Sequence, residues 1–190
     1  MAESVAPASA ARALEAATGA TAVNTDAGYS RRGRFAAGIV VLASAGMLLA
    51  ALGFQYLGGY PPCPLCHLQR YPYVATLVLG LIALPIPGRL KALPIWLAAI
   101  GFGITAAIGA YHAGIEYGWW AGPDSCSGAV GLDATSIEDL RAALEAAPVV
   151  RCDEVAWSLA GISMAGYNAL IAGALTLFCL GAGTRLWRRR

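Results

Sequence analysis

Hydrophobic residues form four long runs along the chain, and the polar residues lie between them. Asp, Glu, Lys and Arg are absent from four windows, residues 35–57, 71–88, 92–115 and 155–184. Windows of about 18 residues or more are long enough for a helix to cross roughly 30 Å of hydrocarbon. They are continuous in apolar character rather than alternating, which indicates helices and argues against strands.

The fold expected from these runs is an all-α membrane protein, a four-transmembrane-helix bundle. Its spans are predicted near residues 35–57, 71–87, 93–113 and 161–183. The composition agrees, because a chain that is 58% hydrophobic and only 13% charged is not an ordinary soluble domain. The net charge of +2 gives no reason to expect a nucleic-acid partner, since the basic residues are explained better by membrane topology.

The basic residues gather in three segments that flank the apolar runs. They are Arg31, Arg32 and Arg34, then Arg89 and Lys91, then Arg185, Arg188, Arg189 and Arg190. Lys and Arg concentrate in cytoplasmic loops, so both termini are predicted to be cytoplasmic. Residues 58–70 and 114–160 then form two exported loops, the second of them acidic.

Three regions follow from this topology. Residues 1–34 are predicted to be a disordered cytoplasmic tail, residues 35–184 the membrane domain, and residues 185–190 a basic cytoplasmic tail. The first of these tails contains no long apolar segment of the kind that a secretory signal requires.

The second exported loop contains the signals of a short amphipathic helix. Thr135 and Glu138 have the spacing of a capping box, and Pro148 ends the segment. Apolar residues recur at helical spacing at Ile137, Leu140 and Leu144. Such a helix is too short to be stable alone in water, so we expect it to rest on the bilayer or on the bundle.

Four of the five cysteines fall in the two exported loops. Cys63 and Cys66 form a C-x-x-C motif in the first loop, and Cys126 and Cys152 bracket a polar segment of the second. Disulfides persist on this side of the membrane. Two cysteine pairs that face one compartment indicate thiol–disulfide exchange between them. Cys179 lies in the middle of the last run and is predicted to be a buried structural residue.

The surroundings of Cys66 favour a reactive thiolate. It lies near the amino end of the second predicted helix, where the helix dipole favours an anion. Arg70 follows four residues later and would share its face if the helix runs through both. Pro72 either kinks that helix or marks its first turn. A cation and a helix amino end both lower a thiol pKa.

Three other uses of these residues compete with exchange. With His67, the motif also reads C-x-x-C-H, the signature of covalent haem attachment, but only about a dozen residues separate the first two spans. The four outer cysteines could bind zinc, although their spacing is irregular. Cys126 and Cys152 could instead form a static staple. For His112, at the outward end of the third run, a functional and a hydrogen-bonding structural role stay equally open.

From about residue 34 to its end, the chain resembles the DsbB family of inner-membrane disulfide-generating proteins. The resemblance rests on the four spans, on Cys63-Pro64-Leu65-Cys66 with Gln69-Arg70, on Cys126 and Cys152, and on residues 157–164. The related vitamin K epoxide reductases usually place the loop cysteines before the C-x-x-C motif. Here they come after it, which favours the DsbB family.

This resemblance implies a quinone-dependent relay in the bacterial inner membrane. Cys126 would be attacked by a reduced periplasmic DsbA-like partner, Cys152 would leave and exchange with Cys63, and Cys66 would face the quinone. The resemblance further implies that Arg70 is a quinone-site arginine and that His112 lies near the ring. The quinone would be ubiquinone or menaquinone from the membrane pool.

Two departures from the family pattern concern His67, where an apolar residue is expected, and the long segment before residue 34. Two alternatives stay open beside a general DsbA oxidase. One is a paralogue dedicated to a single thioredoxin-like partner. The other is a non-catalytic membrane protein whose outer loops are stapled by disulfides.

Overall fold

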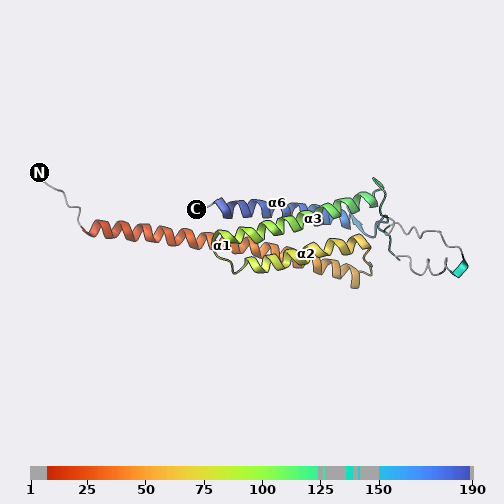
Figure 1. Ribbon diagram of the computed structural model, residues 1–190, viewed down its shortest axis with the longest axis horizontal. Coiled ribbons are helices and arrows are strands. Elements are labelled where there is room, and N and C mark those ends of the chain that lie inside the picture. Colours follow the sequence, from red (N-terminus) through yellow and green to blue (C-terminus); the bar gives the residue numbers. More distant parts are fainter. Residues whose placement is uncertain (1–7, 124–125, 127–135, 139–140, 142–149, 189–190) are drawn as a thin grey trace.

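The computed structural model describes residues 8–123, 126, 136–138, 141 and 150–188, with side chains described from residue 30 onward. Its elements are α1 (Ala8–Tyr56), α2 (Pro64–Ala83), the 3-10 helix η1 (Gly88–Lys91), α3 (Ala92–Glu116), the strands β1 (Ser158–Leu159) and β2 (Ile162–Ser163), and α6 (Met164–Arg188). The four α-helices lie lengthwise in one bundle, and α1 continues beyond it at one end (Figure 1).

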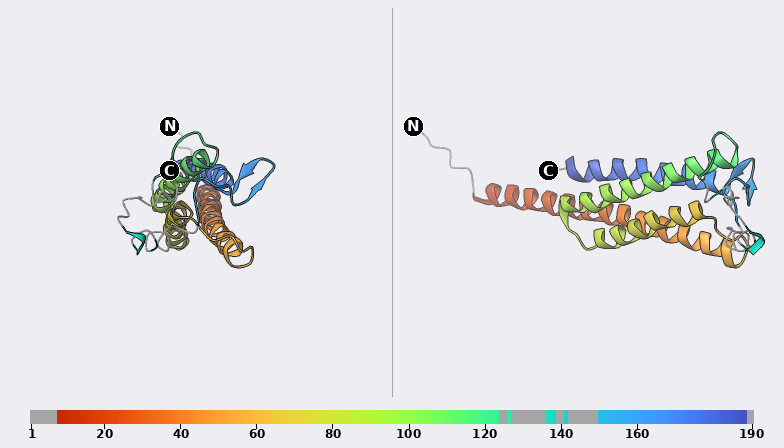
Figure 2. Two further views of the ribbon diagram at one scale, coloured as in Figure 1. Left: turned by 90° about the vertical axis from the view of Figure 1, so that its right-hand side faces the viewer. Right: turned by 45° about the vertical axis from the view of Figure 1, so that its right-hand side comes forward.

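The bundle is arranged around α3. This helix packs along α6 on one side and along α2 on the other, and α1 packs mainly on α2 (Figure 2). Small residues allow these close approaches, as is common where helices meet in membranes. A Cβ atom on Gly101 would lie 2.6 Å from Cγ2 of Thr76, and one on Gly109 would lie 3.1 Å from the Ala169 nitrogen. A larger residue at Gly101 would therefore displace Thr76, and one at Gly109 would press on the backbone of α6.

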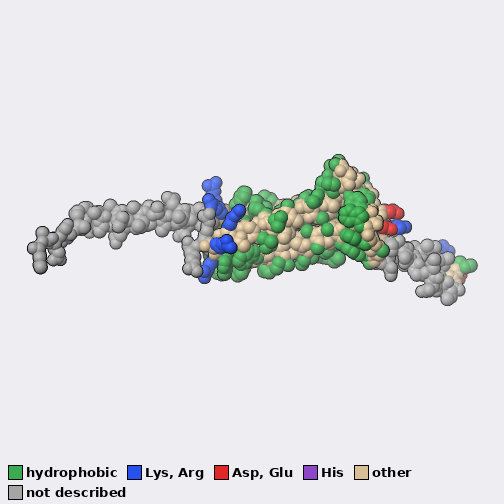
Figure 3. Space-filling view, turned by 90° about the horizontal axis from the view of Figure 1, so that it is seen from above, with side chains coloured by type: hydrophobic (Ala, Val, Ile, Leu, Met, Phe, Trp, Pro, Cys, Tyr) green, Lys and Arg blue, Asp and Glu red, His purple; other side chains and the backbone are tan. Residues whose placement is uncertain are grey.

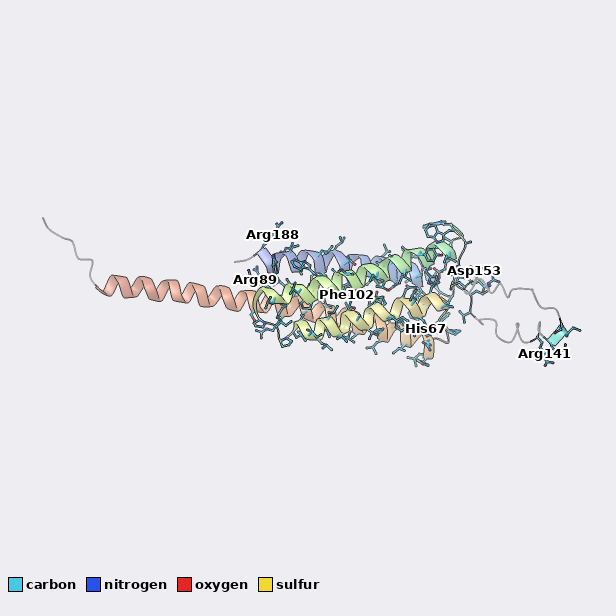
Figure 4. All side chains as sticks on the ribbon, in the orientation of Figure 1. His67, Arg89, Phe102, Arg141, Asp153 and Arg188 are labelled. Atoms are coloured by element: carbon cyan, nitrogen blue, oxygen red, sulfur yellow. A yellow bond between two sulfur atoms is a disulfide. The ribbon has the colours of Figure 1, made fainter. Side chains whose placement is uncertain are left out.

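Three of the described helical segments are long and apolar enough to cross a membrane: Ser30–Tyr56, Gly88–Glu116 and Met164–Arg188. The prediction of a helical membrane protein is thus confirmed. The second predicted span, residues 71–87, overlaps α2 only as far as Ala83; α2 has 20 residues and lies in the same bundle. The side chains of Arg89 and Arg188 lie at one end of the bundle, whereas His67 and Asp153 lie at the other (Figure 4). Lys and Arg side chains gather at the first of these ends (Figure 3).

The first helix departs from the predicted tail. Residues 1–34 were expected to be disordered, but α1 is helical from Ala8 and runs without a break into the first apolar run. The physical reason is the abundance of alanine in its first turns, because alanine is the strongest helix former. Continuity with a stable apolar helix also removes the cost of nucleating a separate one.

The second helix begins seven residues earlier than its predicted span at residue 71. Pro64 occupies its first turn and the Cys63 side chain caps it, so α2 runs through Cys66 and Arg70. Pro72 lies inside the helix, which settles the two possibilities that the sequence left open.

A short β-hairpin, which the sequence did not predict, precedes α6. Ser158 pairs with Ser163 and Leu159 with Ile162 in antiparallel register, so α6 begins at residue 164 rather than 161. The turn residues Ala160 and Gly161 have φ of 50° and 79°, as in the type I′ turns that suit tight hairpins. The predicted amphipathic helix at residues 135–148 lies largely outside the described residues.

Tyr117, the residue after α3, fastens the hairpin to the bundle. Its hydroxyl accepts a hydrogen bond from the Ser163 nitrogen at 2.9 Å and donates one to the Gly161 oxygen at 3.0 Å. The hairpin is therefore held over the end of the bundle where the two cysteine pairs lie.

Candidate active site

The four exported cysteines meet at one end of the bundle. Cys126 and Cys152 form a disulfide with a Cα–Cα distance of 4.9 Å, and both are buried. The sulfurs of Cys63 and Cys152 and a ring nitrogen of His112 all lie within 4.8 Å of one another. Thiol–disulfide exchange requires a thiolate to reach a disulfide sulfur. Cys63 and Cys152 are close enough that a small movement would bring them into contact.

Cys63 and Cys66 share a hydrogen bond at the start of α2. The Cys63 sulfur accepts from the Cys66 backbone nitrogen at 3.3 Å and donates to the Cys66 sulfur at 3.0 Å. This sulfur–sulfur hydrogen bond lowers the pKa of Cys66 to about 7, against the opposing effect of burial. The same hydrogen bond, followed by burial, raises the pKa of Cys63. Cys66 is therefore the thiol of the pair that ionises more readily.

Arg70 contributes to this shift less than the sequence predicted. Its charge also lowers the pKa of Cys66, but the hydrogen bond from Cys63 is the largest cause and Arg70 a smaller one. The guanidinium instead joins α2 to α1, donating to Oε1 of Gln55 at 2.7 Å and to the Ala51 oxygen at 3.4 Å. Arg70 is thus a fixed, half-buried cation at the junction of these two helices.

His112 is buried between Cys63 and Gln69. Its Nε2 lies 3.6 Å from the Cys63 sulfur, and its Nδ1 lies 3.0 Å from Nε2 of Gln69. The same Gln69 nitrogen donates to the Leu65 oxygen at 3.2 Å, so Gln69 presents its amide to the ring and Nδ1 accepts. In the neutral ring Nε2 then carries the proton, and it points to the Cys63 sulfur.

A buried hydrogen-bond network continues from Gln69 into the bundle. Asn168 donates to Oε1 of Gln69 at 2.6 Å and accepts from the Tyr73 hydroxyl at 2.6 Å. Thr105 donates to the backbone oxygen of Gln69 at 2.9 Å. Sequence reasoning missed Tyr73, Thr105 and Asn168. The available signal was Asn168, because a carboxamide within a long apolar run is costly unless it has partners.

A cavity of about 330 Å³ adjoins Cys66 between α1, α2, α3 and α6. Its wall is mostly apolar, with Phe54, Trp157, Met164 and Ile171 among the lining residues. Its polar edge includes Cys66, Arg70, His112 and Glu116. Apolar cavities with a few convergent polar groups are the usual form of small-molecule sites. The volume and the donors fit a flat ring that carries oxygen atoms.

Glu116 was counted from the sequence only among the acidic residues of the second exported loop. The structure places it instead in the last turn of α3, with its side chain 5% exposed and lining the cavity. Its Oε1 lies 3.9 Å from Nε2 of His112. The i,i+4 spacing of these two residues was the signal that could have identified it.

The two rival uses of the cysteines are not favoured by this arrangement. His67 is exposed and is not among the residues that line the cavity, and the thiols of Cys63 and Cys66 are hydrogen-bonded to each other. The disulfide between Cys126 and Cys152 occupies two of the four sulfurs that a four-cysteine zinc site would need.

Helices that can cross a membrane, two adjacent cysteine pairs and a neighbouring apolar cavity define a membrane protein of thiol–disulfide chemistry. Comparison with known families gives the same result. The family model described as Disulfide bond formation protein DsbB matches residues 33–182. The chain therefore belongs to the DsbB family.

Known relatives match most of the chain. The Disulfide bond formation protein B of Albidiferax ferrireducens is 31% identical, covering 79% of this chain and 85% of the relative. That of Xanthomonas oryzae pv. oryzae is 29% identical, covering 84% and 94%. A Rickettsia prowazekii protein called Uncharacterized protein RP370 is 26% identical, covering 82% and 92%. No solved structure matches the chain.

Proposed function

We propose that the protein is a quinone-dependent thiol oxidase that reoxidises a periplasmic DsbA-like dithiol. The observation that carries this proposal is the continuous arrangement of Cys152, Cys63 and Cys66 leading to an apolar cavity. Membership of the DsbB family supports the thiol partner, because the related proteins are named for disulfide bond formation.

The proposed topology has four spans and both termini in the cytoplasm of a bacterial cell. It is supported by the Lys and Arg residues that gather at one end of the bundle, because these residues are enriched on the cytoplasmic side of membrane proteins. The cysteine pairs would then face the periplasm, where disulfides are stable. In this topology the second span runs from about residue 71, through the end of α2, to about residue 87.

The thiol steps conserve electrons at each exchange. A partner thiolate attacks the Cys126 sulfur and releases Cys152 as a thiolate, and the second partner thiol then resolves the mixed disulfide. Cys152 attacks the Cys63 sulfur of an oxidised Cys63–Cys66 pair and releases Cys66 as a thiolate. Attack by Cys126 on the resulting Cys63–Cys152 bond restores the Cys126–Cys152 disulfide. The described arrangement, with that disulfide formed and Cys63 and Cys66 unbonded, corresponds to the stage after these exchanges.

The cavity beside Cys66 is the proposed quinone site. A bound quinone would accept the two electrons and two protons of a dithiol. Arg70 and His112 would hold its oxygen atoms, and the apolar wall would cover the ring and exclude water. The hydrogen bond from Cys63 favours the thiolate form of Cys66, the sulfur that would face this site.

The test is quinone reduction by the purified protein in detergent, with a soluble quinone and a reduced DsbA-like donor. We expect quinone absorbance to fall with the wild type and with Cys179→Ser, which alters a buried cysteine that does not line the cavity. Cys66→Ser should form mixed disulfides with the donor but reduce no quinone. Absence of turnover by a folded wild-type sample with several donors would favour a dedicated partner or stapled loops.

A further inference from the structure

Glu116 is a buried carboxyl group, and among the described residues no Lys or Arg forms an ion pair with it. Its side chain is 5% exposed, and Oε2 has no hydrogen-bond partner among the described residues. The carboxyl interacts with the Ser163 side chain, and Nε2 of His112 lies 3.9 Å from its Oε1. His112 gives little compensation, because its Nε2 proton is directed to the Cys63 sulfur.

A carboxylate in this position is costly, because it is removed from water without a paired charge. A protonated carboxyl is better suited to the site, and it has a proton to donate. Since Glu116 lines the cavity, an occupant with a carbonyl oxygen would supply the partner that Oε2 lacks. The other titratable groups that line the cavity are Tyr60, Cys66, Arg70, Tyr73, His112 and Tyr167.

Glu116 and Cys66 also repel each other when both are charged. A negative charge on Glu116 counteracts the hydrogen bond from Cys63 that lowers the pKa of Cys66. The two groups border one mostly apolar cavity, where charges are poorly screened. Each group is therefore more easily charged when the other is neutral, and their titrations are coupled.

We propose that Glu116 is the proton-carrying residue of the cavity, which takes up a proton when Cys66 becomes a thiolate and gives it up when Cys66 is oxidised. This inference rests on the proposed function for its acceptor, a quinone. The balance is complete: formation of the Cys63–Cys66 disulfide releases two electrons and the Cys63 proton, and Glu116 supplies the second proton. The carboxylate left behind regains its proton from the periplasmic side when the pair is reduced again.

The first test needs no quinone. Alkylation of Cys66 by iodoacetamide is followed against pH in quinone-free protein, and the modified cysteine is identified by mass spectrometry. We expect Glu116→Gln to shift the alkylation profile to lower pH and to raise the rate near pH 6 at least about threefold, which corresponds to half a pKa unit. Glu116→Asp, which keeps the carboxyl, should retain a profile close to the wild type. Glu154→Gln is the matched control, because that side chain is 73% exposed.

The second test measures turnover with quinone. Glu116→Gln should lower kcat at least about tenfold and leave KM for quinone within about twofold, since the side chain is isosteric but carries no transferable proton. Glu116→Asp should recover part of kcat, and it also serves if the glutamine variant does not fold. Overlapping alkylation profiles for wild type and Glu116→Gln would overturn the coupling, and unchanged kcat would overturn the proton transfer. If the wild type reduces no quinone, the proposed function fails, while the alkylation profiles still decide the coupling.

Discussion

The imidazole of His112 lies 3.6 Å from the Cys63 sulfur, although the two residues are 49 positions apart in the chain. Gln69 fixes the ring from the other side at 3.0 Å. This contact links the last turns of α3 to the first turn of α2, the place where the two cysteine pairs meet. His112 therefore positions the Cys63 sulfur, which Cys152 attacks in the proposed exchange, and it connects α3 with α2.

Replacement of His112 by Ala should weaken both roles. Gln69 would lose a buried hydrogen-bond partner, at a cost of about 1–3 kcal/mol in the free energy of unfolding. We also expect slower exchange between Cys152 and Cys63. Thermal unfolding in detergent measures the first effect, and rapid-quench disulfide mapping measures the second. His67→Ala, at an exposed position, should change neither quantity; equal losses in both variants would contradict the role of His112.

Alkylation of the C-x-x-C motif should depend on pH at one cysteine only. The pKa of Cys66 is lowered to about 7, so its alkylation rate should rise from pH 6 to pH 8 with a midpoint near 7. The pKa of Cys63 is raised, so Cys63 should stay unmodified over this range. Cys63→Ala removes the hydrogen bond and should move the Cys66 midpoint up toward its ordinary value. If Cys63→Ala has the same Cys66 midpoint as the wild type, the hydrogen bond from Cys63 is not the cause of the lowered pKa.

Arg70→Ala should affect the cavity more than the thiol. The substitution removes the hydrogen bonds to Gln55 and Ala51 that join α2 to α1. We expect KM for quinone to rise about tenfold, comparable to the loss of one charge-assisted hydrogen bond. The Cys66 midpoint should shift upward, but less than in Cys63→Ala. Gln55→Ala is the comparison that keeps the Arg70 charge. If Arg70→Ala shifted the Cys66 midpoint more than Cys63→Ala does, Arg70 and not the Cys63 hydrogen bond would be the main cause of the lowered pKa.

The two cysteines of the second pair should trap different products. In Cys126→Ser, the remaining Cys152 lies near Cys63 and should form a disulfide within the protein. In Cys152→Ser, the remaining Cys126 should instead accumulate a mixed disulfide with the reduced partner. Peptide mapping under non-reducing conditions distinguishes the two. A partner adduct through Cys152 would show that the roles within this pair are exchanged.

The fold was predictable where one physical signal dominated. Long apolar windows without charges identify membrane helices because an unpaired charge in hydrocarbon is costly. The start of α2 was less accessible, because Pro72 is compatible both with a first turn and with a helix interior. Only the cap formed by Cys63 shows that the helix begins earlier. The hairpin escaped notice because its two-residue strands lie within an apolar run.

The candidate site was predictable at its cysteines and less so around them. Cys63, Cys66, Cys126 and Cys152 were identified as a set by spacing and topology, and the structure brings them together. The largest cause of the lowered Cys66 pKa was not predictable from the sequence, because a hydrogen bond from Cys63 depends on side-chain geometry. Glu116 was assigned to a loop because its charge was taken as the end of the span. Its i,i+4 spacing from His112 was the one sequence signal that α3 could extend to this residue, and the cavity that it lines is visible only in the structure.

Trp157, on the hairpin side of the cavity, has an optical consequence. Its ring packs 5.3 Å from Phe54 and 6.2 Å from Tyr167, and it lines the cavity directly. None of the other four tryptophans of the chain lines that cavity, and two of them, Trp96 and Trp187, pack against each other. An aromatic acceptor that enters the cavity should therefore quench the emission of this one indole. The protein thus contains an intrinsic fluorescent probe of cavity occupancy, and Trp157→Phe would remove its signal.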